Sequence, residues 1–206
     1  MSRARILCFG ELLLRLGAPG HELLLQQPRL EVHCGGAEAN VGVSLAHFGH
    51  DVAMVSTVAD NPLGAAVLGE LRRHAVDTRH VRRVDGRVGL YFLTTGAIHR
   101  ASEVVYDRAD SAFALAPADA YDWPRLLDGA QWLHLSGVSP ALGADVAQAT
   151  LAAARAARAA GVKVSFDGNY RPKLWQRWQG DARGILHDLF ACADVVFADY
   201  RDIGVV

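Results

Sequence analysis

The sequence contains little cysteine, with three residues in a chain of 206 and no Cys-x-x-Cys spacing. Cys8, Cys34 and Cys192 are far apart and odd in number, which favours neither a zinc site nor a disulfide framework. Free cysteines of this kind are typical of a reducing compartment. We therefore expect a cytoplasmic protein that has no metal site built from cysteine.

Long hydrophobic runs and an excess of charge of one sign are also missing. The apolar run near the N-terminus is short and is interrupted by Gly10 and Glu11, so we expect no signal peptide and no membrane span. The formal net charge is −1, from 21 basic and 22 acidic residues. This balance gives no electrostatic reason to expect nucleic acid or an anionic membrane as a partner.

What the sequence does contain is an alternation of apolar strands and amphipathic helices, in a chain that is 51% hydrophobic. Strands are predicted at 4–10, 51–60, 131–137, 162–169 and 194–199. Helices are predicted at 35–49, 61–76, 123–130, 143–161 and 180–193. The pattern predicts a single α/β domain over residues 1–206, with a doubly wound, mostly parallel sheet flanked by helices.

Two extended stretches, at roughly 11–34 and 87–108, fit this alternation poorly. Their apolar and polar residues partly alternate, which indicates strands with one exposed face. We expect them to form a small separate sheet inserted in the α/β body. Such a sheet is a candidate lid over a cleft.

The segment "DGNYR" places polar residues where a predicted apolar strand ends. Asp167, Asn169 and Arg171 occupy every second position, so on a strand their side chains would share one face. Ligands of open parallel sheets bind outside the carboxyl ends of the strands, and a guanidinium there can bind a carboxylate or a phosphate. A strand-end salt bridge with a turn asparagine is the alternative interpretation.

The segment "GGAEAN" is a second candidate for contact with a ligand. Gly36 would let a ligand approach the backbone, and the helix that follows has unpaired N–H groups at its start. Asn40 lies on the first turn, within reach of a polar ligand. A tight turn followed by a helix, with no ligand, explains the same residues.

The extended stretch 87–108 is a third candidate for contact with a ligand. Tyr106 and Arg108 are two residues apart and so share a face, and Tyr91 belongs to the neighbouring extended segment. Two phenols and a guanidinium suit a hydroxylated anionic molecule. Cross-strand aromatic packing with a surface arginine is the alternative.

Together these stretches resemble the ribokinase-like (PfkB-type) carbohydrate kinases. The resemblance rests on "GGAEANVGVSLAHFG", "ADNPLG" and "SFDGNYRPKLW", and more narrowly "VVYDRADSAFA", "LHLSGVSPAL" and "DGNYRPKLW" are similar to 2-keto-3-deoxygluconate kinases. The resemblance implies a ribokinase-like α/β body with a small β-lid that also forms a homo-oligomer contact. It implies transfer of the γ-phosphoryl group of ATP, with Mg²⁺, to the sugar acid 2-keto-3-deoxygluconate.

The resemblance also implies roles for residues that match the family motifs. The expected substrate-binding residues are Gly36, Asn40, Tyr91, Tyr106, Arg108, Val138, Asn169 and Arg171. Gly36 and Asn40 would meet the sugar hydroxyls, the lid residues would close over the sugar, and Arg171 would face the acid group or the phosphate. A neutral sugar would not offset the burial of two guanidinium groups, so Arg108 and Arg171 in one cavity favour an acidic sugar.

The family's catalytic aspartate lies in a Gly-Ala-Gly-Asp segment that is not found up to Val206. We therefore expect a C-terminally incomplete kinase domain, with a natural short form as the alternative. Asp199 and Asp202 stand where relatives often have an Asn-x-x-Glu motif near the metal and phosphates. Another ribokinase-like kinase such as a fructokinase, or a non-catalytic sugar-acid-binding module, are the other functions compatible with the sequence.

Overall fold

The computed structural model, which describes residues 4–206, contains a six-stranded sheet in the order β10-β9-β8-β1-β4-β5, with every neighbouring pair parallel. The chain starts in the middle of this sheet and extends it first to one side and then to the other, as the predicted doubly wound fold requires. The strands are β1 (Arg5–Phe9), β4 (Asp51–Ala59), β5 (Asp77–Val84), β8 (Trp132–Ser136), β9 (Lys163–Asp167) and β10 (Val195–Phe197). The sequence pattern had left β5 unassigned.

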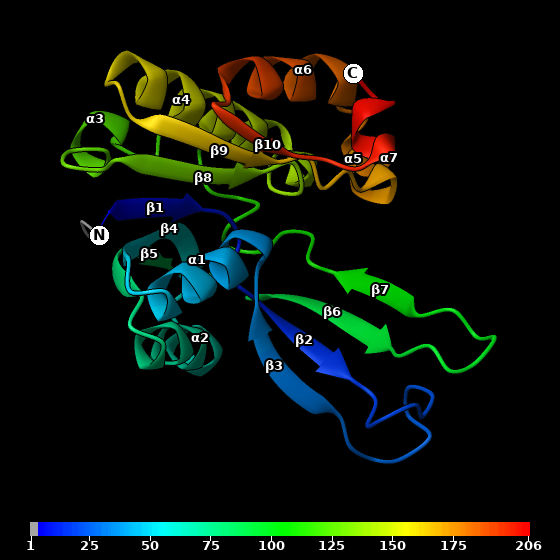
Figure 1. The fold of residues 1–206 in the computed structure, drawn as a ribbon. Helices are drawn as coiled ribbons and strands as arrows, with labels where there is room; N and C mark the ends of the chain where they lie inside the picture. Colours follow the sequence, from blue (N-terminus) through cyan, green and yellow to red (C-terminus); the bar gives the residue numbers. More distant parts are fainter. Residues whose placement is uncertain (1–3) are drawn as a thin grey trace.

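Helices cover both faces of the sheet (Figure 1). Successive side chains of β1 enter different cores, because residues alternate across a strand. Leu7 and Phe9 pack in one cluster, and Ile6 and Cys8 in the other. The first cluster lies under α3 (Trp123–Leu126), α4 (Ala144–Ala159) and α6 (Ala182–Cys192), and the second under α1 (Ala37–His47) and α2 (Pro62–Arg73).

The starts of the helices follow the expected local chemistry. The Asn61 side chain accepts a hydrogen bond of 3.0 Å from the Gly64 N–H and caps α2, with Pro62 as the first helical residue. Three short elements were not predicted: η1 (Pro140–Leu142), α5 (Pro172–Trp178) and α7 (Tyr200–Ile203). Within residues 4–206, none of the helices has both the length and the apolar character needed to cross a membrane.

A second, four-stranded sheet, hereafter the small sheet, projects from the α/β body (Figure 1). Its strands are β2 (Leu13–Gly17), β3 (Glu31–Gly35), β6 (Gly89–Thr94) and β7 (Glu103–Asp107), in the order β3-β2-β6-β7. They fall in the two stretches whose alternation predicted a separate sheet. Val32 on β3 and Val105 on β7 are 57% and 49% exposed, so apolar side chains of this sheet reach solvent.

One buried histidine makes the stability of this fold depend on pH. His134 on β8 is buried, its Nδ1 lies 3.2 Å from the Ser165 hydroxyl, and burial lowers its pKa from 6.5 to about 4. As pH falls below 6.5 the unfolded chain takes up a proton that the folded chain excludes, so stability falls. Since one pKa unit corresponds to about 1.4 kcal/mol, this loss approaches about 3 kcal/mol near pH 4.

We expect His134→Gln to remove this part of the pH dependence, as measured by urea unfolding at several pH values between 7 and about 4. The difference in free energy of unfolding between variant and parent should shift in favour of the variant as pH falls. His99→Gln, at an exposed position, is the control and should follow the parent. If the free energies of unfolding of His134→Gln and the parent changed in parallel with pH, His134 would not be the source of the pH dependence.

Candidate functional site

A cavity of about 660 Å³ lies between the carboxyl end of β9, the start of α1 and the small sheet. It has a mixed polar and apolar lining, to which six separate segments of the chain contribute. All eight residues predicted to bind substrate line it: Gly36, Asn40, Tyr91, Tyr106, Arg108, Val138, Asn169 and Arg171. Leu13, Ala37, Val104 and Asp167 complete the wall.

The start of α1 requires a glycine at position 36. Gly36 has φ = 154°, and a Cβ atom placed there would lie 2.4 Å from the Glu11 carbonyl oxygen. The Gly36 carbonyl accepts the Asn40 N–H at 2.9 Å, which places Asn40 on the first turn of the helix. The glycine therefore lets the helix start approach the end of β1, as a ligand-contacting turn requires.

The residues after β9 line the cavity for a different reason from the one predicted. The strand ends at Asp167, and Asn169 has φ = 40°, so the every-second-residue rule of a strand does not extend to Asn169 and Arg171. A turn brings these side chains to the cavity instead. The Tyr170 N–H donates to Asp202 Oδ1 at 2.8 Å and holds that turn. The predicted shared strand face is wrong, although all three side chains line one cavity.

Arg108 is a buried, paired residue. Its Nε and Nη2 lie 2.7 and 2.5 Å from Glu11 Oε2, and the Ser111 hydroxyl donates to Glu11 Oε1 at 2.5 Å. The side chains of Arg108 and Glu11 are 8% and 1% exposed. The alternative of a surface arginine is therefore wrong. The expectation that only an acidic ligand can offset the burial of Arg108 is also wrong, because the carboxylate of Glu11 already supplies the opposite charge.

Tyr91 and Tyr106 are cross-strand neighbours on β6 and β7, with ring centroids 6.4 Å apart, and both line the cavity. Tyr91 and Tyr106 therefore pack against each other and also line the cavity.

Arg171 differs from Arg108: it is exposed and forms no ion pair within 4.0 Å among residues 4–206. The alternative of an Asp167–Arg171 salt bridge is therefore not observed.

Two buried acids behind the cavity were missed by sequence reasoning. Glu38 is buried, and its Oε1 accepts hydrogen bonds from the hydroxyls of Ser136 at 2.8 Å and Ser139 at 2.7 Å. Burial raises the pKa of Glu38, and these serine bonds oppose the rise. Glu11 is the other acid. The position of Glu11 in the sequence could have identified it as a candidate site residue. It follows Gly10 at the carboxyl end of the central strand, where ligands of parallel sheets bind.

Asp199 and Asp202, which the sequence placed near a metal and phosphates, are engaged in capping α7. Asp199 Oδ1 accepts the N–H groups of Arg201 and Asp202, and Asp202 Oδ2 accepts the Asp199 N–H, so both carboxylates form the capping box of α7. Asp199 Oδ2 also pairs with the Arg201 guanidinium at 2.7 Å. Within residues 4–206, no group of three or more His, Cys, Asp or Glu side chains has an arrangement suited to a metal.

Asp167 is the carboxylate of the cavity wall itself. It is half-buried, and burial together with the nearby Asp202 raises its pKa, while Arg171 opposes the rise. A carboxyl group with a raised pKa beside a guanidinium can accept a hydrogen bond from a ligand hydroxyl, or donate one when protonated. The cavity therefore offers hydroxyl-binding groups and a cation within one wall.

Residues 3–204 match the sequence pattern of the pfkB family carbohydrate kinases. A 2-dehydro-3-deoxygalactonokinase of Haloferax volcanii is 37% identical over 205 residues, covering 98% of this chain and 63% of the relative. A fructokinase of Salmonella typhimurium is 33% identical over 184 residues, covering 84% of this chain and 53% of the relative.

The crystal structure of 2-dehydro-3-deoxygluconokinase from Thermotoga maritima has a TM-score of 0.93 and 41% identity with this chain. The match covers 99% of this chain and 62% of that structure. The chain thus spans less than two thirds of the length of each of these three proteins.

The buried ion pair generates a prediction about stability. Glu11→Ala leaves the Arg108 guanidinium buried without a partner, which costs about 3–5 kcal/mol. Glu11→Leu combined with Arg108→Met removes both charges and should recover most of that loss. Urea unfolding of the parent, Glu11→Leu, Arg108→Met and the double variant gives the coupling energy. A double variant as unstable as Glu11→Ala would show that the ion pair is not what holds this region.

The left-handed backbone at Asn169 generates a second prediction. Asn169→Ala and Asn169→Gly both remove the amide, but only glycine adopts a positive φ without steric cost. We expect the alanine variant to be less stable than the glycine variant by about 1–2 kcal/mol in urea unfolding. Equal stabilities would mean that the backbone at this turn is not constrained as described.

Proposed function

Because the chain belongs to the pfkB family of carbohydrate kinases, we propose that its cavity binds a sugar acid for phosphorylation by ATP. The substrate we propose is 2-keto-3-deoxygluconate, also named 2-dehydro-3-deoxygluconate. The observation that carries the proposal is that one cavity gathers all eight predicted substrate residues, including one guanidinium that has no ion-pair partner among residues 4–206.

The wall residues have complementary roles in this proposal. Asn40, Asn169 and the two phenols form hydrogen bonds with sugar hydroxyls, because amides and phenols both donate and accept. Arg171 binds the substrate carboxylate, or the phosphoryl group as it arrives, through parallel N–H donors. Arg108, held by Glu11, contributes its remaining N–H groups to the cavity wall.

The cavity opens between the body and the small sheet, which we propose acts as a lid over the bound sugar. We also propose that this sheet forms a homo-oligomer contact, which the exposed Val32 and Val105 support. ATP as the phosphoryl donor follows from the family. Catalysis by the complete protein needs a base, which we expect outside residues 4–206.

A fructokinase is the second candidate, and a specific observation favours it. Glu11 neutralises Arg108, so the cavity holds one unpaired guanidinium where an acid-specific site was expected to hold two. A neutral sugar therefore meets a smaller electrostatic penalty than the sequence suggested. The relative from Salmonella typhimurium named fructokinase agrees with this possibility.

Isothermal titration of the 206-residue chain with 2-keto-3-deoxygluconate, its galactonate epimer and fructose tests the proposal. We expect the sugar acids to bind more tightly than fructose, and Arg171→Ala to weaken only the sugar acids, by about tenfold or more. Arg171→Lys keeps the charge but loses the two-pronged contact, so its affinity should be intermediate. The exposed Arg183→Ala on α6 is the matched control.

Tighter binding of fructose, or an equal loss for all sugars in Arg171→Ala, would defeat the sugar-acid assignment. A coupled assay of ADP release with the same sugars separates an active kinase from a binding module. Sugar-acid binding without turnover would identify the chain as a non-catalytic sugar-acid-binding part.

A further inference from the structure

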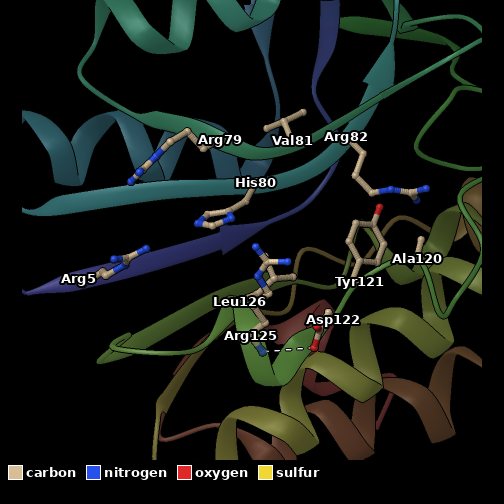
Figure 2. A pocket seen from close by; sticks show the side chains of 10 residues that line it. All are labelled: Arg5, Arg79, His80, Val81, Arg82, Ala120, Tyr121, Asp122, Arg125 and Leu126. Carbon is tan, nitrogen blue, oxygen red and sulfur yellow. Dashed lines mark hydrogen bonds between the residues drawn. The ribbon is translucent and has the colours of Figure 1, made fainter.

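A second cavity of about 520 Å³ shares no lining residue with the first. It lies between the edge strand β5, the start of β1 and the segment that leads into α3 (Figure 2). Its volume falls within the range of small-molecule sites. None of its residues was part of the predicted sugar site, so its occupant is independent of the proposed function.

The wall of this cavity has a strong excess of positive charge. Four arginines, at positions 5, 79, 82 and 125, line it with one acid, Asp122. The chain as a whole has a net charge of −1, so this excess is local and does not follow from composition. Arginines without counter-ions repel one another, and such a cluster attracts anions into the hollow that it borders.

The neighbouring acids do not cancel this charge. Arg79 pairs with Asp77 at 2.8 Å, but Arg5, Arg82 and Arg125 have no ion-pair partner within 4.0 Å in the part of the chain that the structure describes. Asp122 caps α3, where its Oδ1 accepts the backbone N–H of Arg125 at 3.3 Å. Three guanidinium groups thus remain available to a ligand.

A buried atom points to a ligand independently of the arginines. The Nε2 atom of His80 is buried and has no hydrogen-bond partner among the described residues. Figure 2 shows the ring pointing from β5 into the space bordered by Arg5 and Arg125. An unsatisfied buried nitrogen destabilises the folded chain, and a small rotation of the ring that brings Nε2 to the cavity surface would let a ligand oxygen satisfy it.

We propose that this cavity binds a small phosphorylated metabolite. A phosphate monoester carries a charge of about −1.5 to −2 near pH 7, which balances the three unpaired guanidiniums better than a single carboxylate does. The apolar part of the lining, from Val81, Ala120 and Leu126, suits the organic body of such a compound. The volume of about 520 Å³ and the net charge of −1 on the chain favour a small ligand over nucleic acid.

Isothermal titration with glucose 6-phosphate, glucose, gluconate and inorganic phosphate tests the proposal. We expect glucose 6-phosphate to bind, glucose and gluconate to bind about tenfold more weakly or not at all, and added salt to weaken binding. Binding of inorganic phosphate as tight as that of glucose 6-phosphate would overturn a metabolite ligand in favour of a bare anion site.

Variants locate the binding. Arg82 and Arg125 are exposed, so Arg82→Ala combined with Arg125→Ala should fold and lose glucose 6-phosphate affinity by about tenfold or more. Arg171→Ala, in the cavity proposed to bind the sugar acid, and Arg183→Ala on α6 should both retain the affinity for glucose 6-phosphate. Loss of affinity in Arg171→Ala with none in the double variant would place the phosphate in the sugar cavity and overturn the proposal.

Nuclear magnetic resonance of the histidine rings gives a readout that does not depend on these variants. Glucose 6-phosphate should shift the Nε2 signal of His80 and leave the signal of the exposed His99 in place. Binding with an unchanged His80 signal would also overturn the assignment of this cavity.

Discussion

The buried ion pair between Glu11 and Arg108 is the interaction on which the cavity between β9, α1 and the small sheet depends. It joins Glu11, two residues beyond the central strand β1, to Arg108, which directly follows β7, the last strand of the small sheet. Two charges withdrawn from water are stable only when they are close and fully hydrogen-bonded, and Ser111 occupies the second carboxylate oxygen. Because Tyr106 is two residues from Arg108, the same pair fixes the position of a cavity wall relative to the body.

The neighbourhood of Glu11 also explains why glycines are required around the cavity. Its carbonyl would be 2.4 Å from a Cβ at Gly36, and its Oε1 would be 2.4 Å from a Cβ at Gly89. Glu38 likewise requires a glycine at position 10, because its Oε2 would lie 2.0 Å from a Cβ there. A side chain at Gly10, Gly36 or Gly89 would therefore clash with one of the two buried acids or its backbone.

Sequence reasoning predicted the fold class, and it selected eight residues that line one cavity, but it did not predict the contacts that place them there. The strand and helix periods set the parallel sheet, and the polar residues at strand ends identified the cavity wall. Asn169 could not be placed, because a positive φ depends on the turn that Asp202 holds from 32 residues away. The partner of Arg108 was missed for the same reason: Glu11 is 97 residues away, and no local pattern links the two.

The electrostatics of the cavity follow from which charges are already compensated. Glu11 offsets Arg108, so the preference of the cavity for an anion depends on the balance between Arg171 and Asp167. Burial and the nearby Asp202 raise the pKa of Asp167, which favours its neutral form more than solvent would. A ligand carboxylate near Arg171 would favour protonation of Asp167 further, since two like charges beside one cation repel each other. If the proposed function holds, discrimination between an acid and a neutral sugar is therefore a property of Arg171 and Asp167, and Arg108 contributes to the shape of the cavity more than to its charge.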